Sequence, residues 1–213
     1  MPFALTARCL APRILPRMAS LDILILALLS RQQAHGYELK KQVEAALGGA
    51  MGLNNKVLYP TLKRFEAMGA VTSKLVTQDA FPPRRVFSVT DKGLDTLRDM
   101  LEDFDDAAAR NPGEFQVRFA FFDLLPPGSR MEILQRRLKA VERDLERFNP
   151  GFVTNACSRW ADSHLGALLD LFGKELGCER DWLRARMDAE LDSGWQRRTS
   201  ATRVGMRSEA RRK

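Results

Sequence analysis

The chain has 213 residues, of which 45% are hydrophobic and 29% are charged, as in ordinary soluble globular proteins of one large or two small domains. Its longest apolar run, Ile23 to Leu29, is too short to cross a membrane, so we expect no membrane partner. Three widely spaced cysteines and only two histidines argue against a disulfide framework, a metal site and histidine-based catalysis. We therefore predict a cytoplasmic protein without cofactor, metal or enzymatic activity.

The charge is divided unevenly along the chain. Residues 1–19 carry a net charge of +3, residues 20–93 carry +4 and residues 197–213 carry +6, whereas residues 94–196 carry −6. Such a division is typical of a module that binds a polyanion and is joined to a region that does not.

A regular helical pattern of apolar residues begins only after residue 19. Residues 1–19 are rich in arginine and proline, so we interpret them as a flexible basic extension; an organelle transit peptide is the alternative. From Ser20, which can cap a helix, apolar residues recur at helical spacing. The segment "HGYELKKQVEAALGG" (35–49) predicts a second helix that begins at a His35 cap and ends at two glycines.

The segment "NNKVLYPTLKRFEAMG" (54–69) predicts a third helix with two different faces. At 100° per residue, Leu58, Leu62 and Phe65 share one face, which we expect to be buried. The candidate DNA-binding residues lie on the opposite face and at the helix entrance: Asn54, Asn55, Lys56, Tyr59 and Lys63. Asparagine can read adenine, and lysine can read guanine or neutralise phosphate. A merely solvated face with asparagine caps is the alternative.

A β-hairpin is expected after this helix. The β-branched runs "AVTSKLV" (70–76) and "RVFSVT" (85–90) are separated by "TQDAFPPR" (77–84), which reads as a turn. Arg84 and Arg85 are placed at its tip, where arginines contact phosphates or enter the minor groove. Three helices and a two-stranded wing predict a winged helix-turn-helix over residues 20–93 that binds double-stranded DNA through the 54–69 helix and the 78–85 wing.

Residues 94–196 are expected to form an all-helical dimerisation domain, so that the fold is mainly α. Helices are predicted near 91–109, 114–124, 129–148, 154–172 and 179–192, followed by a disordered basic tail over 197–213. A narrow heptad seam suggests a homodimer interface with a second helix as its partner. The predicted dimerisation residues are Met131, Leu134, Leu138, Val141, Leu145 and Phe148, with Leu183, Met187 and Leu191 on the partner helix. Packing of the seam inside its own subunit is the alternative.

Aromatic residues in the C-terminal part suggest a ligand pocket. Phe119, Trp160 and Trp182 are candidates to line a site for a small hydrophobic effector. Plain core packing is the alternative for aromatics at helical spacing.

Several motifs in the first half of the chain resemble those of the PadR family of bacterial transcriptional regulators. They are H-G-Y-E-L (35–39), L-Y-P-T-L-K-R (58–64), E-A-M-G (66–69), P-P-R-R (82–85) and T-D-K-G (90–93). Phe81 departs from the glycine that the family usually has before the paired prolines, and Phe87 and Ser88 replace its usual aromatic and charged positions.

The resemblance implies a homodimeric repressor that releases DNA when a small molecule or stress signal arrives. A two-fold dimer would place its two recognition helices on the half-sites of a palindromic operator. A winged-helix protein-interaction module or scaffold without sequence-specific DNA binding is the alternative function.

Overall fold

The computed structural model describes residues 18–46, 53–78, 81–147 and 164–210, and the expected extension lies almost wholly outside these ranges. The chain divides into two compact units. Among the described residues, 18–125 belong to the first unit and 126–210 belong to the second. Within the described ranges, no helix is both long enough and apolar enough to cross a bilayer.

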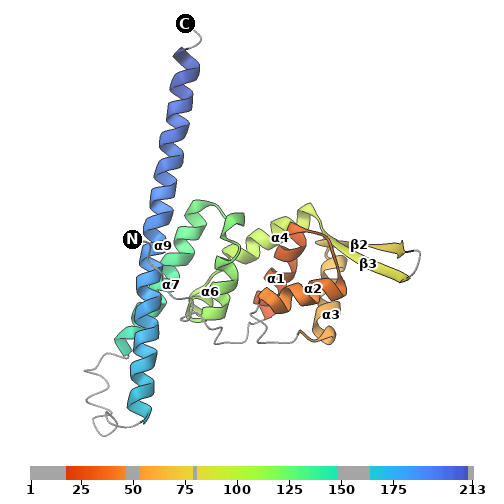
Figure 1. Cartoon of the computed structure of the whole chain (residues 1–213), viewed down its shortest axis with the longest axis horizontal. Helices are drawn as coiled ribbons and strands as arrows, with labels where there is room; N and C mark the ends of the chain where they lie inside the picture. Colours follow the sequence, from red (N-terminus) through yellow and green to blue (C-terminus); the bar gives the residue numbers. More distant parts are fainter. Residues whose placement is uncertain (1–17, 47–52, 79–80, 148–163, 211–213) are drawn as a thin grey trace. The chain divides into compact units, whose positions relative to one another are not determined.

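Helix α1 (Met18–Arg31) forms the centre of the first unit. It is apolar on almost every side, and Ile23, Ile25 and Leu26 are completely buried. A helix that is hydrophobic all round must be covered by neighbours on all sides. The elements that pack against α1 include α2 (Gly36–Ala46), α4 (Asp91–Glu102), α6 (Pro112–Phe119) and strand β3 (Phe81–Val89) (Figure 1).

The wing is an antiparallel sheet of three strands in the order β1-β3-β2. Strand β2 (Val71–Gln78) pairs with β3 as predicted, while the unpredicted β1 (Ala34–His35) pairs with the other side of β3. Both hairpin strands are longer than the sequence predicts, and Pro82 and Pro83 lie in β3 instead of in a turn. The register shifts opposite these prolines, and this irregularity accommodates residues that cannot donate ladder hydrogen bonds.

Two glycines fix the junctions at the base of the hairpin. Gly69, with φ of 73°, follows helix α3 (Asn55–Ala67) in the left-handed conformation that glycine adopts without strain. Gly93 lies in the first turn of α4, where an added Cβ would stand only 2.0 Å from the carbonyl oxygen of Ala70. The hydroxyl of Thr90 caps α4 by accepting a hydrogen bond from the Gly93 N–H at 3.1 Å. The T-D-K-G motif therefore packs the start of α4 tightly against the end of the α3 turn.

The first unit continues through α5 (Asp106–Arg110), α6 and the 3-10 helix η1 (Phe122–Leu124). The predicted single helix over 91–109 is interrupted, because Asp105 caps α5 by accepting a hydrogen bond from the Ala108 N–H. The compact unit thus extends past residue 93, where the sequence suggested a domain division. The assignment of residues 94–196 to dimerisation stays a prediction.

A buried polar cluster ties α6 to α1 and to the end of α4. The Glu114 carboxylate accepts hydrogen bonds from the Ser20 hydroxyl at 2.5 Å and from the Arg118 guanidinium at 2.6 Å. Arg118 also donates to the carbonyl oxygens of Met100 and Asp103. Because the Glu114 and Arg118 side chains are almost completely buried, each needs these partners to offset the loss of water.

The second unit is built from α7 (Pro127–Arg147) and α9 (His164–Ala210), which pack against each other. The ion pair of Arg137 with Glu179 is bidentate, with both N–O distances at 2.7 Å. Further pairs join Arg130 to Glu190 at 3.5 Å and Arg184 to Glu142 at 2.7 Å. The two helices run antiparallel to each other (Figure 1).

The sequence predicts separate helices near 154–172 and 179–192, and the break between them is wrong, because α9 is continuous through Gly173 and Gly177 (Figure 1). A glycine inside a helix costs about 1 kcal/mol relative to alanine. Packing against α7 offsets a cost of this size. The backbone of α9 is helical as far as Ala210, over much of the segment that the sequence predicts to be a disordered tail.

Candidate nucleic-acid interface

Helix α3 is amphipathic in the way the sequence predicts. Leu58, Leu62 and Phe65 are buried, so the helix is fixed to the core of the first unit through one face. The Asn54 side chain caps the helix by accepting a hydrogen bond from the Lys56 N–H at 2.9 Å. Burial of one face and a firm N-terminal cap hold the opposite face in a defined direction.

The exposed face of α3 carries the candidate DNA-binding residues. The exposed side chains are Asn54, Asn55, Lys56, Tyr59 and Lys63. Pro60 is exposed on the same face, where water can satisfy the carbonyl that has lost its helical hydrogen bond. The face therefore offers two cations and several hydrogen-bonding groups without a neighbouring element covering them fully.

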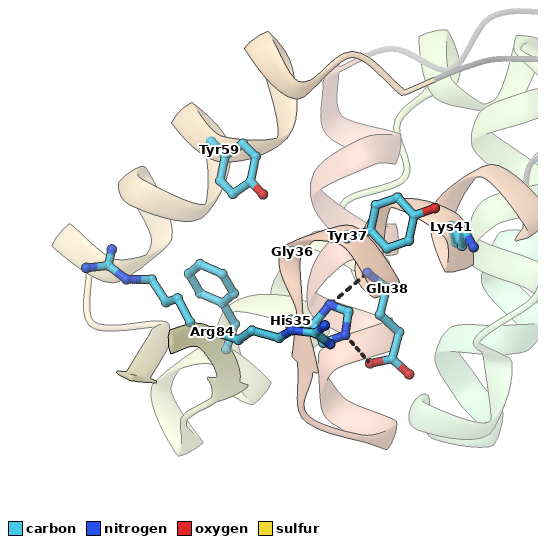
Figure 2. A pocket seen from close by; sticks show the side chains of 9 residues that line it. His35, Gly36, Tyr37, Glu38, Lys41, Tyr59 and Arg84 are labelled. Carbon is cyan, nitrogen blue, oxygen red and sulfur yellow. Dashed lines mark hydrogen bonds and ion pairs between the residues drawn. The ribbon is translucent and has the colours of Figure 1, made fainter. Parts of the chain in front are cut away.

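Tyr59 has a more defined position than the sequence suggested. Its ring lies against Gly36 at the start of α2, as Figure 2 shows. A Cβ added at Gly36 would stand 2.8 Å from the Tyr59 hydroxyl oxygen, so the glycine provides the space for the ring. Tyr59 remains 47% exposed and contributes both to the outer face of α3 and to the boundary between α3 and α2.

Arg84 and Arg85 lie in strand β3, not at the tip of the hairpin. They pair in register with Val76 and Leu75 of β2 and are exposed. Arg85 forms an ion pair of 3.8 Å with Glu66 at the C-terminal end of α3. The Glu66 carboxylate also accepts a short hydrogen bond from Ser73 of β2. These contacts connect the wing to the recognition-helix candidate.

A second ion pair connects α3 to the core helix α1. The Arg64 guanidinium donates a 2.5 Å hydrogen bond to the Asp22 carboxylate, which is nearly buried. Burial raises the pKa of Asp22 above its ordinary value, while the hydrogen bond and the charge of Arg64 act in the opposite direction. Neither residue belongs to the predicted site, yet the pair fixes the side of α3 that faces α1.

An open pocket of about 710 Å³ lies where the start of α2, Tyr59 and strand β3 meet (Figure 2). Its lining includes Tyr37, Lys41 and His35, which sequence reasoning did not assign to the site. Lys41 Nζ stands 4.6 Å from the centre of the Tyr37 ring. The i, i+4 spacing of Tyr37 and Lys41 within a helix was the signal that could have found them.

His35 acts as the helix cap that the sequence predicts. Its Nδ1 accepts a hydrogen bond from the Glu38 N–H at 3.1 Å, and its Nε2 stands 3.9 Å from the Glu38 carboxylate (Figure 2). The imidazole therefore stabilises the first turn of α2, next to the pocket.

The predicted dimerisation residues fall into two groups in the second unit. Leu134, Val141 and Leu183 are buried within the single chain, in the contact between α7 and α9. The remaining described residues are half-buried or exposed: Met131, Leu138, Leu145, Met187 and Leu191. Phe148 lies outside the described residues. The face of α7 that packs against α9 also contains the buried Arg137, a charged residue that the predicted apolar seam did not include. The homodimer interface stays a prediction.

The predicted effector residues are distributed over both units. Phe119 belongs to a row of packed rings, 5.7 Å from Phe115 and 4.8 Å from Phe122 between centroids. Trp182 is half-buried on α9, and Trp160 lies outside the described residues. The effector pocket therefore stays a prediction. In the part of the chain that the structure describes, no three potential metal ligands lie together.

Comparison with known proteins adds an independent finding for the first unit. Residues 25–99 match the model of the transcriptional regulator PadR-like family. A negative transcriptional regulator PadR from Bacillus subtilis is 23% identical over 128 residues, which cover 60% of this chain and 70% of that protein.

Solved structures of regulators are also similar to parts of the chain. The padr family transcriptional regulator from Eggerthella lenta is 31% identical with a TM-score of 0.33, covering 38% of this chain and 67% of that chain. Bacillus subtilis PadR in complex with operator DNA is 19% identical with a TM-score of 0.36, covering 80% of this chain and 98% of that chain.

Proposed function

Through residues 25–99 the chain belongs to the PadR-like family of transcriptional regulators, and from this premise we propose that it represses transcription as a homodimer bound to a palindromic operator. Helix α3 enters the major groove, and the wing contacts the adjacent minor groove or its phosphates. Repression is also the activity named for the Bacillus subtilis relative, a negative transcriptional regulator.

The observation that carries this proposal is the exposed face of α3. Lys56, Tyr59 and Lys63 project from a helix whose other face is buried and whose N-terminus is capped. A rigid helix that presents cations and amide groups from an otherwise packed domain fits the width of the major groove. The arginines of β3 supply further positive charge on the neighbouring element.

A homodimer follows from the limited reach of one α3 helix. One recognition helix contacts only a few base pairs, whereas a two-fold dimer contacts two half-sites about 34 Å apart. Among the predicted dimerisation residues, Met131, Leu138, Leu145 and Met187 are half-buried and Leu191 is exposed, so these remain available for a partner copy. A small hydrophobic effector that relieves repression belongs to the same proposal.

The experiment is a mobility shift with the DNA upstream of the chain's own gene. The protein should retard this duplex at concentrations at which a scrambled duplex of equal composition stays free. Lys63→Ala should weaken operator binding by about 1–3 kcal/mol if Lys63 reads a base. Light scattering after size exclusion tests the dimer separately, and a monomer at micromolar concentration contradicts that part of the proposal.

A protein-interaction module is the second candidate function. Leu75 and Val76 of the wing are exposed, with 68% and 43% of their surfaces accessible, which is unusual for a strand that contacts only phosphates. If the winged helix docks a protein, neither the promoter duplex nor the scrambled duplex should be retarded at physiological salt.

A further inference from the structure

A glutamate near the C-terminal end of α3 contacts both strands of the wing. The Glu66 carboxylate accepts a hydrogen bond from the Ser73 hydroxyl of β2 and stands 3.8 Å from the Arg85 guanidinium of β3. We propose that Glu66 is a positioning residue for DNA recognition, which holds the wing at a fixed angle to α3 and restrains Arg85 from contacting any phosphate within reach. This inference rests on the proposed function and assigns a role to a residue that the candidate site does not include.

The register of the hairpin places Ser73 and Arg85 on the same face of the sheet. Ser73 pairs with Phe87, and Leu75 pairs with Arg85, so all four side chains share that face. Phe87 is buried, which shows that the base of this face is turned toward the body of the first unit. Arg85 therefore lies on the face of β3 from which its side chain can reach α3.

Glu66 acts at the point where the hairpin leaves the body of the unit. On one side of β3, the pairing with β1 ends at Val86, and Arg85 is the next residue outward. On the other side, β2 is the edge strand of the sheet, and Glu66 holds it through Ser73. A wing that pivots at this point would move its outer residues relative to α3 (Figure 1).

The charge of Glu66 adds a second effect to its hydrogen bond. The Arg85 side chain is 58% exposed, whereas that of Glu66 is 24% exposed. An ion pair of this kind contributes little free energy, so a DNA phosphate can displace the carboxylate from Arg85 at a small cost. Glu66 therefore weakens the attraction of the wing for phosphates and leaves Arg85 at the surface.

The position of the wing matters on the operator more than on other DNA. On the operator, α3 and the wing must fit adjacent grooves at the same time, so a wing that already has the correct angle loses less conformational freedom on binding. On random duplex no register is required, and affinity depends mainly on charge. Glu66 should therefore raise the ratio of operator affinity to random-duplex affinity.

The test is fluorescence anisotropy of labelled promoter and scrambled duplexes, titrated with the full chain between about 50 and about 200 mM salt. Glu66→Gln removes the charge but keeps an oxygen that can accept the hydrogen bond of Ser73. It should raise the affinity for the scrambled duplex by up to about eightfold near 0.1 M salt for each subunit in contact. The slope of log K against log salt should become steeper by up to about 0.9 per subunit.

Ser73→Ala removes the hydrogen bond and leaves every charge in place. It should lower the affinity for the promoter duplex about two- to twelvefold per subunit, as expected for the loss of one hydrogen bond. The affinity for the scrambled duplex and the salt slope should not change. Ser73→Thr keeps the hydroxyl and should keep the wild-type ratio.

A matched control exists on α7, where Glu132 pairs with Arg136 at 2.7 Å. Glu132→Gln makes the same change in net charge as Glu66→Gln and also releases an arginine, but far along the chain from the wing. It should leave the affinity ratio and the salt slope at their wild-type values.

Hydrogen exchange of the backbone amides of β2 and β3 tests the position of the wing without DNA. Glu66→Ala removes both contacts and should speed exchange in the outer part of the hairpin, whereas Glu132→Gln should not. The proposal is overturned if Glu66→Ala exchanges like the wild type. It is also overturned if the wild type prefers the promoter duplex and both Ser73→Ala and Glu66→Gln keep its affinity ratio and salt slope. If the wild type shows no preference while the exchange changes as expected, the proposed function fails and Glu66 still holds the wing.

Discussion

Two glutamate–arginine pairs in this chain share the same spacing and distance but differ in burial and in further partners, and they allow a sharp prediction about stability. Glu114 and Arg118 in α6, and Glu132 and Arg136 in α7, have the same i, i+4 spacing, with N–O distances of 2.6 and 2.7 Å. The first pair is nearly inaccessible, at 2% and 4%, whereas the second is 61% and 44% exposed. Replacing each glutamate by leucine changes helix propensity very little.

Glu114→Leu should destabilise the first unit by about 3–5 kcal/mol, because it leaves the Arg118 charge buried without its carboxylate. The Ser20 hydroxyl loses its acceptor in the same substitution. For a domain of this size, the change should lower the unfolding temperature by roughly 12–20 °C. Glu132→Leu should change stability by less than about 0.5 kcal/mol, as expected for an exposed helix pair.

Thermal unfolding followed by far-UV circular dichroism measures both substitutions under the same conditions. The difference in burial predicts a large difference in unfolding temperature between the two variants. Equal shifts for Glu114→Leu and Glu132→Leu would refute it, because burial would then have no effect on the energy of the pair. A small shift for Glu114→Leu alone would mean that water enters the cluster and solvates Arg118.

Three other substitutions test single contacts. Gly93→Ala should destabilise the first unit by more than about 3 kcal/mol in urea unfolding, because its Cβ would overlap a backbone oxygen that cannot turn away. Gly36→Ala should change stability by less than about 1 kcal/mol, since the Tyr59 ring can swing aside, but should weaken DNA binding in anisotropy titrations. The raised pKa of Asp22 means that the folded chain takes up its proton more readily than the unfolded chain. Wild type should therefore gain stability relative to Asp22→Asn as the pH falls through that raised pKa toward 3.8, and urea unfolding at several pH values measures this gain.

Much of the winged helix could be predicted from the sequence, because its elements depend on local patterns. The periodicity of Leu58, Leu62 and Phe65 and the cap at Asn54 identified α3 and its exposed face. The fold class of a winged helix followed by helices is confirmed. The position of Tyr59 against Gly36 and the Arg85–Glu66 pair depend on contacts between separate elements, which periodicity does not contain.

Less of the second half of the chain could be predicted, because the heptad pattern alone does not specify how its helices pack. The heptad spacing in α7 indicated an apolar seam, but a seam does not specify whether its partner lies in the same chain. Leu134 and Val141 are buried against α9 of the same chain, and Arg137 shares their face with a bidentate partner. The glycines of α9 predicted a helix break. The helix is continuous instead, because helix propensity is a weak local term that packing overrides.

The most direct test of the central claim is the specificity ratio of a variant with an altered α3 surface. Lys56→Ala combined with Lys63→Ala should be compared with wild type and with Lys139→Ala combined with Lys174→Ala, a charge-matched control on α7 and α9. The affinity for the upstream duplex and for its scrambled version is measured by anisotropy at one salt concentration. The account predicts that the α3 variant loses its preference for the upstream duplex while the control keeps the wild-type ratio. An unchanged ratio in the α3 variant would contradict the assignment of α3 as the recognition helix.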